Sequence, residues 1–354
     1  MPLSPPKALQ GLRLCAGLGL AHALADAATG WLLFSQVSLP QGFGLFLLYN
    51  LIGFAFQPLA GVVLDDLDAP RSGVIAGLGL LAAGLWLSTW QLPLAILAAA
   101  LGSALFHSGA GALSVLTGRH AGSGLFTAPG VLGLSLGTAA ALMHAPALLP
   151  GLLFCLLLLA AVLLKGADTP AEALQDETHR LPAGARLETA LFLLLAAIAL
   201  RSFIWSGCQI LSQGQPATIL LLGVSAALGK LLGGLLGARF GWRRTVGVSL
   251  ALAIPLLTAG PGQPLLLALG VAALQASTPL LLTVLIGLMP RQPATAAGLA
   301  LGLALAVGGA PLLLLPDPSS WLPAFLLPAG LLLGSLWLAM HKNPVNSLLG
   351  HADA

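Results

Sequence analysis

Apolar residues run through this sequence in long stretches, interrupted by Pro, Gly and short clusters of charged residues. A helix needs roughly 20 apolar residues to cross about 30 Å of hydrocarbon, and twelve stretches approach that length. We therefore predict an all-α integral membrane protein with twelve transmembrane helices. The predicted spans are 10–35, 41–64, 72–90, 94–118, 122–143, 146–165, 187–211, 216–238, 245–260, 264–288, 294–315 and 320–340.

One polar stretch, residues 166–186, divides this pattern into two halves of six predicted spans. Its charged residues are Asp168, Glu172, Asp176, Glu177, Arg180 and Arg186. Such a division is typical of transporters built from two helical bundles around a site near the bilayer midplane. We expect an N-terminal six-helix bundle in 1–165, a linker loop at 166–186, a pseudo-symmetric C-terminal bundle in 187–342 and a tail at 343–354.

The Lys and Arg residues outside the spans fall on one side of the predicted membrane. If the N-terminus is inside, the inside segments hold Lys7, Arg13, Arg71, Arg119, Lys165, Arg180, Arg186, Arg239, Arg243, Arg244, Arg291 and Lys342. The other two, Arg201 and Lys230, lie within spans. Because cytoplasmic loops carry the Lys and Arg excess, we expect a multi-pass protein of a bacterial-type inner membrane with both termini in the cytoplasm.

The composition supports a membrane protein and excludes several other classes. Charged residues make up 7% of the chain, against about a quarter in a soluble domain. Basic residues are scattered without a stripe or stacking aromatics, so we expect no nucleic-acid partner. The three Cys residues lie in apolar segments and indicate neither a disulfide framework nor a zinc site. No phosphate-binding Gly-x-x-x-x-Gly-Lys-Ser/Thr loop is present, and we expect no cofactor and no enzymatic activity.

A Gly-x-x-x-Asp…Arg pattern closes the second predicted span, with Gly61, Asp65 and Arg71. It resembles the signature that the major facilitator superfamily carries between its helices 2 and 3. Gly61 permits close helix approach, while Asp65 and Arg71 can pair or cap neighbouring helix ends and so latch the cytoplasmic face. The segment after the eighth span repeats the glycines and basic residues, with Arg239 and Arg243 but no acidic residue. Ordinary loop charges are the alternative explanation.

Further motifs are similar to those of the fosmidomycin-resistance branch of that superfamily. They are His22-x-x-x-Asp26, Gln57-Pro58, Gly102-Ser103-x-x-Phe106-His107, Gly118-Arg119-His120, Leu288-Met289-Pro290 and Gly298-x-x-x-Gly302. The resemblance covers about half of the chain and implies drug export by proton exchange. It also implies a fold in which helices 1, 4, 7 and 10 line a central cavity.

This sequence departs from the motifs of the fosmidomycin-resistance branch and of the superfamily's antiporters at three places, which limits the functional inferences that the resemblance supports. Ser108 and Gly109 stand where the branch usually has Pro-Glu after its Phe-His, and Gly287 stands where it has a Glu. Gly137 is followed by Thr138 where antiporters of the superfamily often have Gly-Pro. Two carboxylates and one proline are therefore missing, and drug export by proton exchange does not transfer as a whole.

Asp26 is the only carboxylate that we place deep inside a predicted span. An ionisable side chain there costs about 2.5–3.5 kcal/mol, so it usually faces a cavity or a partner. His22 lies one helical turn from Asp26 on the same face, and His107 is about half-way through the fourth span. We interpret Asp26 and His22 as proton-coupling residues and His107 as a substrate-binding residue. A structural cluster that joins helices 1 and 4 is the alternative, and a metal site formed by all three is a looser one.

Polar residues of the seventh and tenth predicted spans complete the candidate substrate site. These are Arg201, Trp205, Gln209, Gln275 and Thr278. Arg201 and Trp205 form one stripe with either Cys208 or Gln209. A permanently charged Arg201 needs an anion, which is either Asp26 or an anionic substrate, unless it packs against backbone carbonyls.

These observations predict a monomeric secondary transporter that moves a small solute across the lipid bilayer by alternating access. Proton coupling is the expected energy source, and the resemblance favours efflux. An importer of a small organic anion or of a metal chelate is the first alternative. A non-transporting assembly subunit on a transporter-like scaffold is an alternative of another class.

The predicted topology can be tested by cysteine labelling. A cysteine introduced into 166–186 should not react with a membrane-impermeant thiol reagent in intact cells, because every loop Lys and Arg lies on that side. A cysteine introduced into 261–263, a predicted outside connection, should react and serves as the control. Efficient labelling in 166–186 would overturn the orientation.

Overall fold

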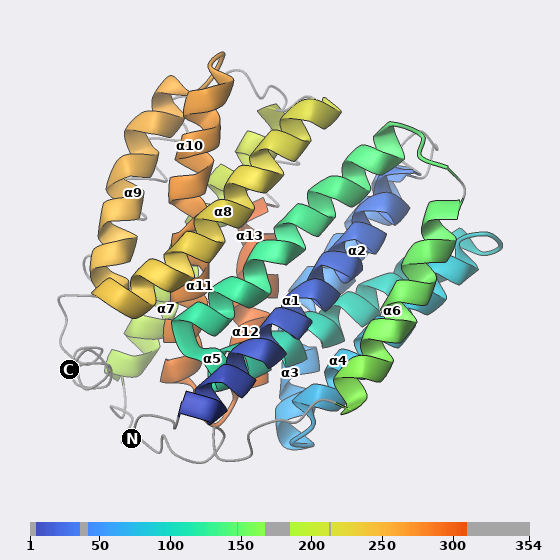
Figure 1. Ribbon diagram of the computed structural model, residues 1–354, viewed down its shortest axis with the longest axis horizontal. Coiled ribbons are helices and arrows are strands. Elements are labelled where there is room, and N and C mark those ends of the chain that lie inside the picture. The colour runs from blue at the N-terminus through green and yellow to red at the C-terminus, as the bar shows by residue number, and fades with distance from the viewer. Residues whose placement is uncertain (1–4, 36–41, 147, 167–184, 212–213, 310–354) are drawn as a thin grey trace.

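The computed structural model describes residues 5–35, 42–146, 148–166, 185–211 and 214–309, and these residues form helices joined by short turns (Figure 1). The helices are α1 (Pro5–Phe34), α2 (Gly42–Asn50), α3 (Gln57–Asp66), α4 (Pro70–Leu87), α5 (Leu92–Leu142), α6 (Leu148–Gly166), α7 (Ala185–Leu211), α8 (Pro216–Phe240), α9 (Trp242–Ala259), α10 (Pro264–Gln275), α11 (Ser277–Leu288), α12 (Pro293–Gly298) and α13 (Ala304–Gly309). Two π-helical turns, η1 (Leu51–Ala55) and η3 (Leu299–Leu303), join α2 to α3 and α12 to α13.

Proline begins many of these helices. It occupies one of the first two positions of α3, α4, α5, α8, α10 and α12. A proline at this position sacrifices no hydrogen bond, because the first backbone N–H groups of a helix have no acceptor within the helix. Its ring also holds φ at a helical value. Except for Pro58, which lies inside the predicted span 41–64, these prolines also stand at the boundaries between apolar runs in the sequence, and the helix starts there could be predicted closely.

Every predicted span except the last corresponds to a helical segment. Within the described ranges, eight helices are long and apolar enough to cross a membrane. Three further predicted spans correspond to helical segments outside this set of eight. Span 10–35 corresponds to α1, span 245–260 to α9, and span 294–315 to the shorter apolar segment Pro293–Gly309. The span at 320–340, the tail and nearly all of the linker lie outside the described residues, so the division into two bundles at 166–186 stays a prediction.

The fourth and fifth predicted spans are joined by a very short connection. We expected a short connection between them, and the structure joins them within α5 by a kink at Arg119, where φ is 48°. The two parts, Leu92–Leu116 and Arg119–Leu142, are each long enough to cross a membrane. The positive φ of Arg119 marks the point at which the regular helix is interrupted.

Helices distant in the sequence pack side by side. The helix α1 lies along α5, and α5 in turn packs against α4 and α8, while α3 packs against α12. Figure 1 shows the first-half helices α1–α6 on one side of the molecule and α7–α13 on the other, with α5 and α8 adjoining between them. The outer face of α6 exposes large apolar side chains, as a lipid-facing surface requires: Leu148, Leu152, Leu159, Val162 and Leu163.

The carboxylate of Asp65 joins the two halves by capping α12. Its Oδ1 accepts the backbone N–H of Ala294 at 2.9 Å, and its Oδ2 accepts the backbone N–H and the hydroxyl of Thr295 at 2.8 and 2.7 Å. These N–H groups lie in the first turn of α12, where no acceptor within the helix is available. A negative charge at this end also interacts favourably with the helix dipole.

Gly61 makes this contact possible. A Cβ atom at Gly61 would lie 2.5 Å from the Cα of Thr295 and would clash with the carbonyl of Ala294. The absent side chain therefore lets α3 approach the start of α12 closely enough for Asp65 to reach it.

The other predicted latch residues make contacts within their own half of the sequence. Arg71 donates from Nε and Nη2 to the carbonyl of Leu164, at 3.0 and 2.6 Å, in the last turn of α6. In the second half, the Arg239 guanidinium lies 5.4 Å from the centre of the Phe240 ring. The corresponding distance from Arg243 to the Trp242 ring is 5.6 Å.

Replacing Asp65 should weaken the contact between α3 and α12. We expect Asp65→Ala to lower the melting temperature of the purified protein measurably, since a helix cap contributes about 1 kcal/mol. Asp66→Ala removes the same charge from the exposed neighbouring position and should have little effect. Equal melting temperatures for the two variants would contradict the capping role.

Candidate functional site

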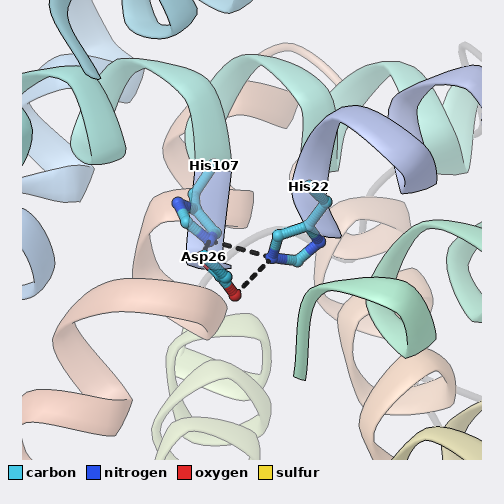
Figure 2. Close-up of side chains that lie close together, drawn as sticks. All are labelled: His22, Asp26 and His107. Atoms are coloured by element: carbon cyan, nitrogen blue, oxygen red, sulfur yellow. Dashed lines mark hydrogen bonds and ion pairs between the residues drawn. The ribbon is translucent and has the colours of Figure 1, made fainter. Parts of the chain in front are cut away.

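Three polar side chains converge between α1 and α5. Asp26 and His22 lie one turn apart on α1, and His107 comes from the first part of α5 (Figure 2). The Nε2 atoms of the two histidines are 3.0 Å apart. The carboxylate of Asp26 places Oδ2 at 3.1 Å from His22 Nε2 and Oδ1 at 3.4 Å from His107 Nε2.

Backbone carbonyls orient both imidazoles. His22 Nδ1 lies 2.9 Å from the carbonyl oxygen of Phe126, and His107 Nδ1 lies 2.8 Å from that of Ser103. A carbonyl oxygen can only accept, so each Nδ1 carries a proton and donates it. In the neutral form of each ring, the Nε2 lone pair then points at the centre of the cluster.

The His22 ring fits into a gap in the surface of α5. It stacks on the ring of Phe126, with a centroid distance of 4.5 Å and an interplanar angle of 26°. A Cβ atom at Gly130 would clash with the imidazole itself. The missing side chain at Gly130 and the aromatic ring at Phe126 therefore set the position of His22 together.

Tyr49 connects this cluster to α2. Its hydroxyl lies 3.2 Å from Thr29 Oγ1 on α1 and also interacts with the Ser103 side chain on α5. No sequence motif assigned Tyr49 a role, and Ser103 stood only within the Gly102-Ser103-x-x-Phe106-His107 motif. One signal was present, because Tyr49 is the only tyrosine in the chain and stands within an apolar stretch.

Arg201 forms a second polar centre with α10 and α11. Its Nη1 donates to Gln275 Oε1 at 3.0 Å and to Thr278 Oγ1 at 2.9 Å. Thr278 also donates to Gln275 Oε1, at 2.8 Å. The guanidinium is buried, and its Nε has no hydrogen-bond partner among the described residues. Of the predicted substrate residues in the seventh and tenth spans, Arg201, Gln275 and Thr278 therefore contact one another.

The partners that Arg201 does have are neutral. Besides Gln275 and Thr278, its Nη2 donates to Ser202 Oγ at 3.4 Å. The carboxylate of Asp26, the other anion we considered for Arg201, makes its ion pairs with the two histidines instead. The described part of the chain therefore surrounds a buried guanidinium with dipoles and not with a carboxylate.

The remaining predicted residues of α7 differ in their exposure. Trp205 is buried one turn beyond Arg201, and Cys208 is buried as well, whereas Gln209 is exposed. The buried stripe therefore continues through Cys208. Lys230 of α8 is partly exposed, and the charges of both Arg201 and Asp26 act on it.

Comparisons with known proteins identify the fold. Sequence searches find neither a matching family model nor a matching curated protein. Among solved structures, the chain is similar to the major facilitator superfamily transporter FucP in its outward conformation, with a TM-score of 0.72 and 17% identity over 93% of this chain and 97% of that one. A variant of the E. coli fucose:proton symporter FucP matches with a TM-score of 0.69 and 16% identity over 94% and 98%.

A human protein gives a similar result. The organic anion transporter MFSD10 matches with a TM-score of 0.69 and 20% identity, over 95% of this chain and 100% of that one. At these identities the likeness establishes the architecture and does not single out the fosmidomycin-resistance branch. The chain is an all-α membrane protein with the fold of the major facilitator superfamily.

Proposed function

We propose that this protein is a secondary transporter that moves a small solute across the membrane by alternating access, with protons as the coupling ion. The observation that carries the proposal is the cluster of Asp26, His22 and His107 inside the membrane-spanning part. The fold supports it, because solved structures of this architecture include a fucose:proton symporter. Export is the direction that the sequence resemblance favours, in a monomer of a bacterial-type inner membrane with both termini in the cytoplasm.

The cluster has the chemistry of a proton site. Two Nε2 lone pairs and a carboxylate converge within 3.0–3.4 Å, and without a positive charge among them they would repel one another. One proton on either imidazole turns these contacts into charge-assisted hydrogen bonds. The carboxylate is 16% exposed while both imidazoles are more deeply buried, so Asp26 is the group through which a proton enters or leaves.

The contact of Asp65 with α12 lies where it could control opening of the transporter toward the cytoplasm during alternating access. It joins segments of the two halves near the predicted cytoplasmic end of the second span. Opening toward the cytoplasm requires these segments to separate, so the cap must be lost in that state. We propose that Asp65 and Gly61 stabilise the state that is closed on the cytoplasmic side.

Asp26→Asn tests the proton-coupling role. The variant should lose solute accumulation driven by a pH gradient in sealed vesicles, because an amide cannot carry a proton at this position. Exchange of solute without a pH gradient should persist, which shows that the protein is folded. Asp66→Asn, at an exposed position of α3, is the matched control. Full pH-driven accumulation by Asp26→Asn would show that the coupling assignment is wrong.

A second candidate function, transport of a small organic anion, is favoured by Arg201. Its guanidinium is buried among neutral partners, with Nε unpartnered among the described residues. A buried charge without a counter-charge is costly, so a bound carboxylate or phosphate would offset its desolvation. The solved structure of a human organic anion transporter shares the fold. The positive charge of Lys230 acts in the same region.

Arg201→Gln tests this candidate. A panel of small carboxylates and phosphates, each paired with a neutral analogue, should contain anions that raise the melting temperature of the wild-type protein. The variant should bind such an anion roughly ten- to hundredfold more weakly, since hydrogen bonds to charged groups contribute about 1.5–3 kcal/mol. It should itself melt close to the wild type, because Gln275 and Thr278 retain each other as partners.

The control is Arg244→Gln, at an exposed position of α9. This change should alter neither anion affinity nor the melting temperature. Unchanged affinity together with a large loss of stability in Arg201→Gln would contradict the anion site and assign Arg201 a structural role.

A further inference from the structure

We propose that His22, Asp26 and His107 form a binding site for a divalent transition-metal ion of the Zn²⁺ or Co²⁺ type. The three side chains offer one ligand atom each, two imidazole nitrogens and a carboxylate oxygen. Figure 2 shows the three side chains turned toward one another. The binding itself rests on this geometry, and only the exchange of the ion for protons rests on the proposed function.

The ligand atoms lie at separations close to those around a tetrahedral ion. Bonds of about 2.0–2.1 Å to nitrogen and oxygen place ligand atoms about 3.3 Å from one another in a tetrahedron. The two Nε2 atoms are 3.0 Å apart, Oδ2 of Asp26 lies 3.1 Å from His22 Nε2, and Oδ1 lies 3.4 Å from His107 Nε2. The two nitrogens thus approach different carboxylate oxygens, and one ligand atom from each residue lies within 4.8 Å of the others. A rotation of the carboxylate would let one oxygen complete the set around an ion.

The orientation of the imidazoles is a second, independent observation. A histidine that binds a metal through one ring nitrogen almost always donates its other N–H to a carbonyl, a carboxylate or water, which fixes the tautomer. His22 and His107 both do so through Nδ1, to the carbonyls of Phe126 and Ser103. Because these carbonyls belong to α5, the helix holds both Nε2 atoms ready as ligands before any ion arrives.

The kind of ion follows from the donor set. Imidazole nitrogens favour Zn²⁺, Co²⁺, Ni²⁺ and Cu²⁺, whereas Mg²⁺ and Ca²⁺ prefer sites made of oxygen ligands. Three protein ligands leave one position open, as in zinc sites that exchange a water or substrate molecule. An open position suits an ion that must enter and leave, in contrast to a closed structural site.

The local charge is compatible with a divalent ion. Two neutral imidazoles, one carboxylate and a divalent ion have a net charge of +1, whereas the cluster with one proton on an imidazole is neutral. Metal binding would therefore release that proton and raise the net charge of the cluster by one. Among residues on other helices, the charge of Asp26 acts on Lys230 and on the Tyr49 hydroxyl, and neither of them is a ligand atom in this cluster.

Co²⁺ binding to the purified full-length protein tests the proposal, because the visible absorption of Co²⁺ reports its coordination. We expect one ion per chain, a spectrum typical of tetrahedral nitrogen and oxygen ligands, displacement by Zn²⁺, and no displacement by excess Mg²⁺. His107→Gln and Asp26→Asn should each weaken binding at least tenfold. His144→Gln removes an exposed histidine at the end of α5 and should bind as the wild type does.

The wild-type titration decides the matter even if a variant fails to fold. A monodisperse wild-type protein that binds no Co²⁺ would overturn the metal site, as would binding that is unchanged in both folded variants. Neither outcome depends on transport. A protein that binds Co²⁺ but shows no solute transport would instead overturn the proposed function and leave the metal site intact.

Discussion

The convergence of the Asp26 carboxylate with two imidazole lone pairs requires a positive charge between α1 and α5. Both imidazoles are buried and the carboxylate is only 16% exposed, and the proton or metal ion that we propose would bridge these groups. Neighbouring residues of α5 hold the two imidazoles in this arrangement. Carbonyls of α5 hold both rings in one tautomer, and Gly130 leaves the space that His22 occupies. Both the proposed proton site and the proposed metal site rest on this arrangement.

The second charged centre lies apart from the first and has the opposite requirement. Arg201 is buried among the neutral side chains of Ser202, Gln275 and Thr278, so the group it lacks is an anion. If Arg201 and Asp26 were paired, each would satisfy the other and neither would need a ligand. Because they make separate contacts in the described structure, the proposed cation site and the proposed anion site are distinct.

The junction between α3 and α12 illustrates how such a protein can switch between states. The Asp65 carboxylate satisfies donors at the first turn of α12 that no residue of that helix can reach, and Gly61 allows the close approach. The contact combines these hydrogen bonds with a small buried apolar cluster of Leu64, Ala112 and Ala294. Breaking the hydrogen bonds of Asp65 would be one step of the proposed opening toward the cytoplasm.

The sequence by itself determined the spans, many helix starts and the expected orientation, because apolar run length, proline position and the distribution of Lys and Arg act locally. It also indicated that Asp26, His22 and His107 belong to one site, since two of them share a helix face. Only the tertiary structure decided that Asp26 pairs with histidines and not with Arg201, and that Tyr49, Gly130 and the Phe126 carbonyl support the site. These facts depend on how each helix is rotated and packed against its neighbours, which spacing along one chain does not specify.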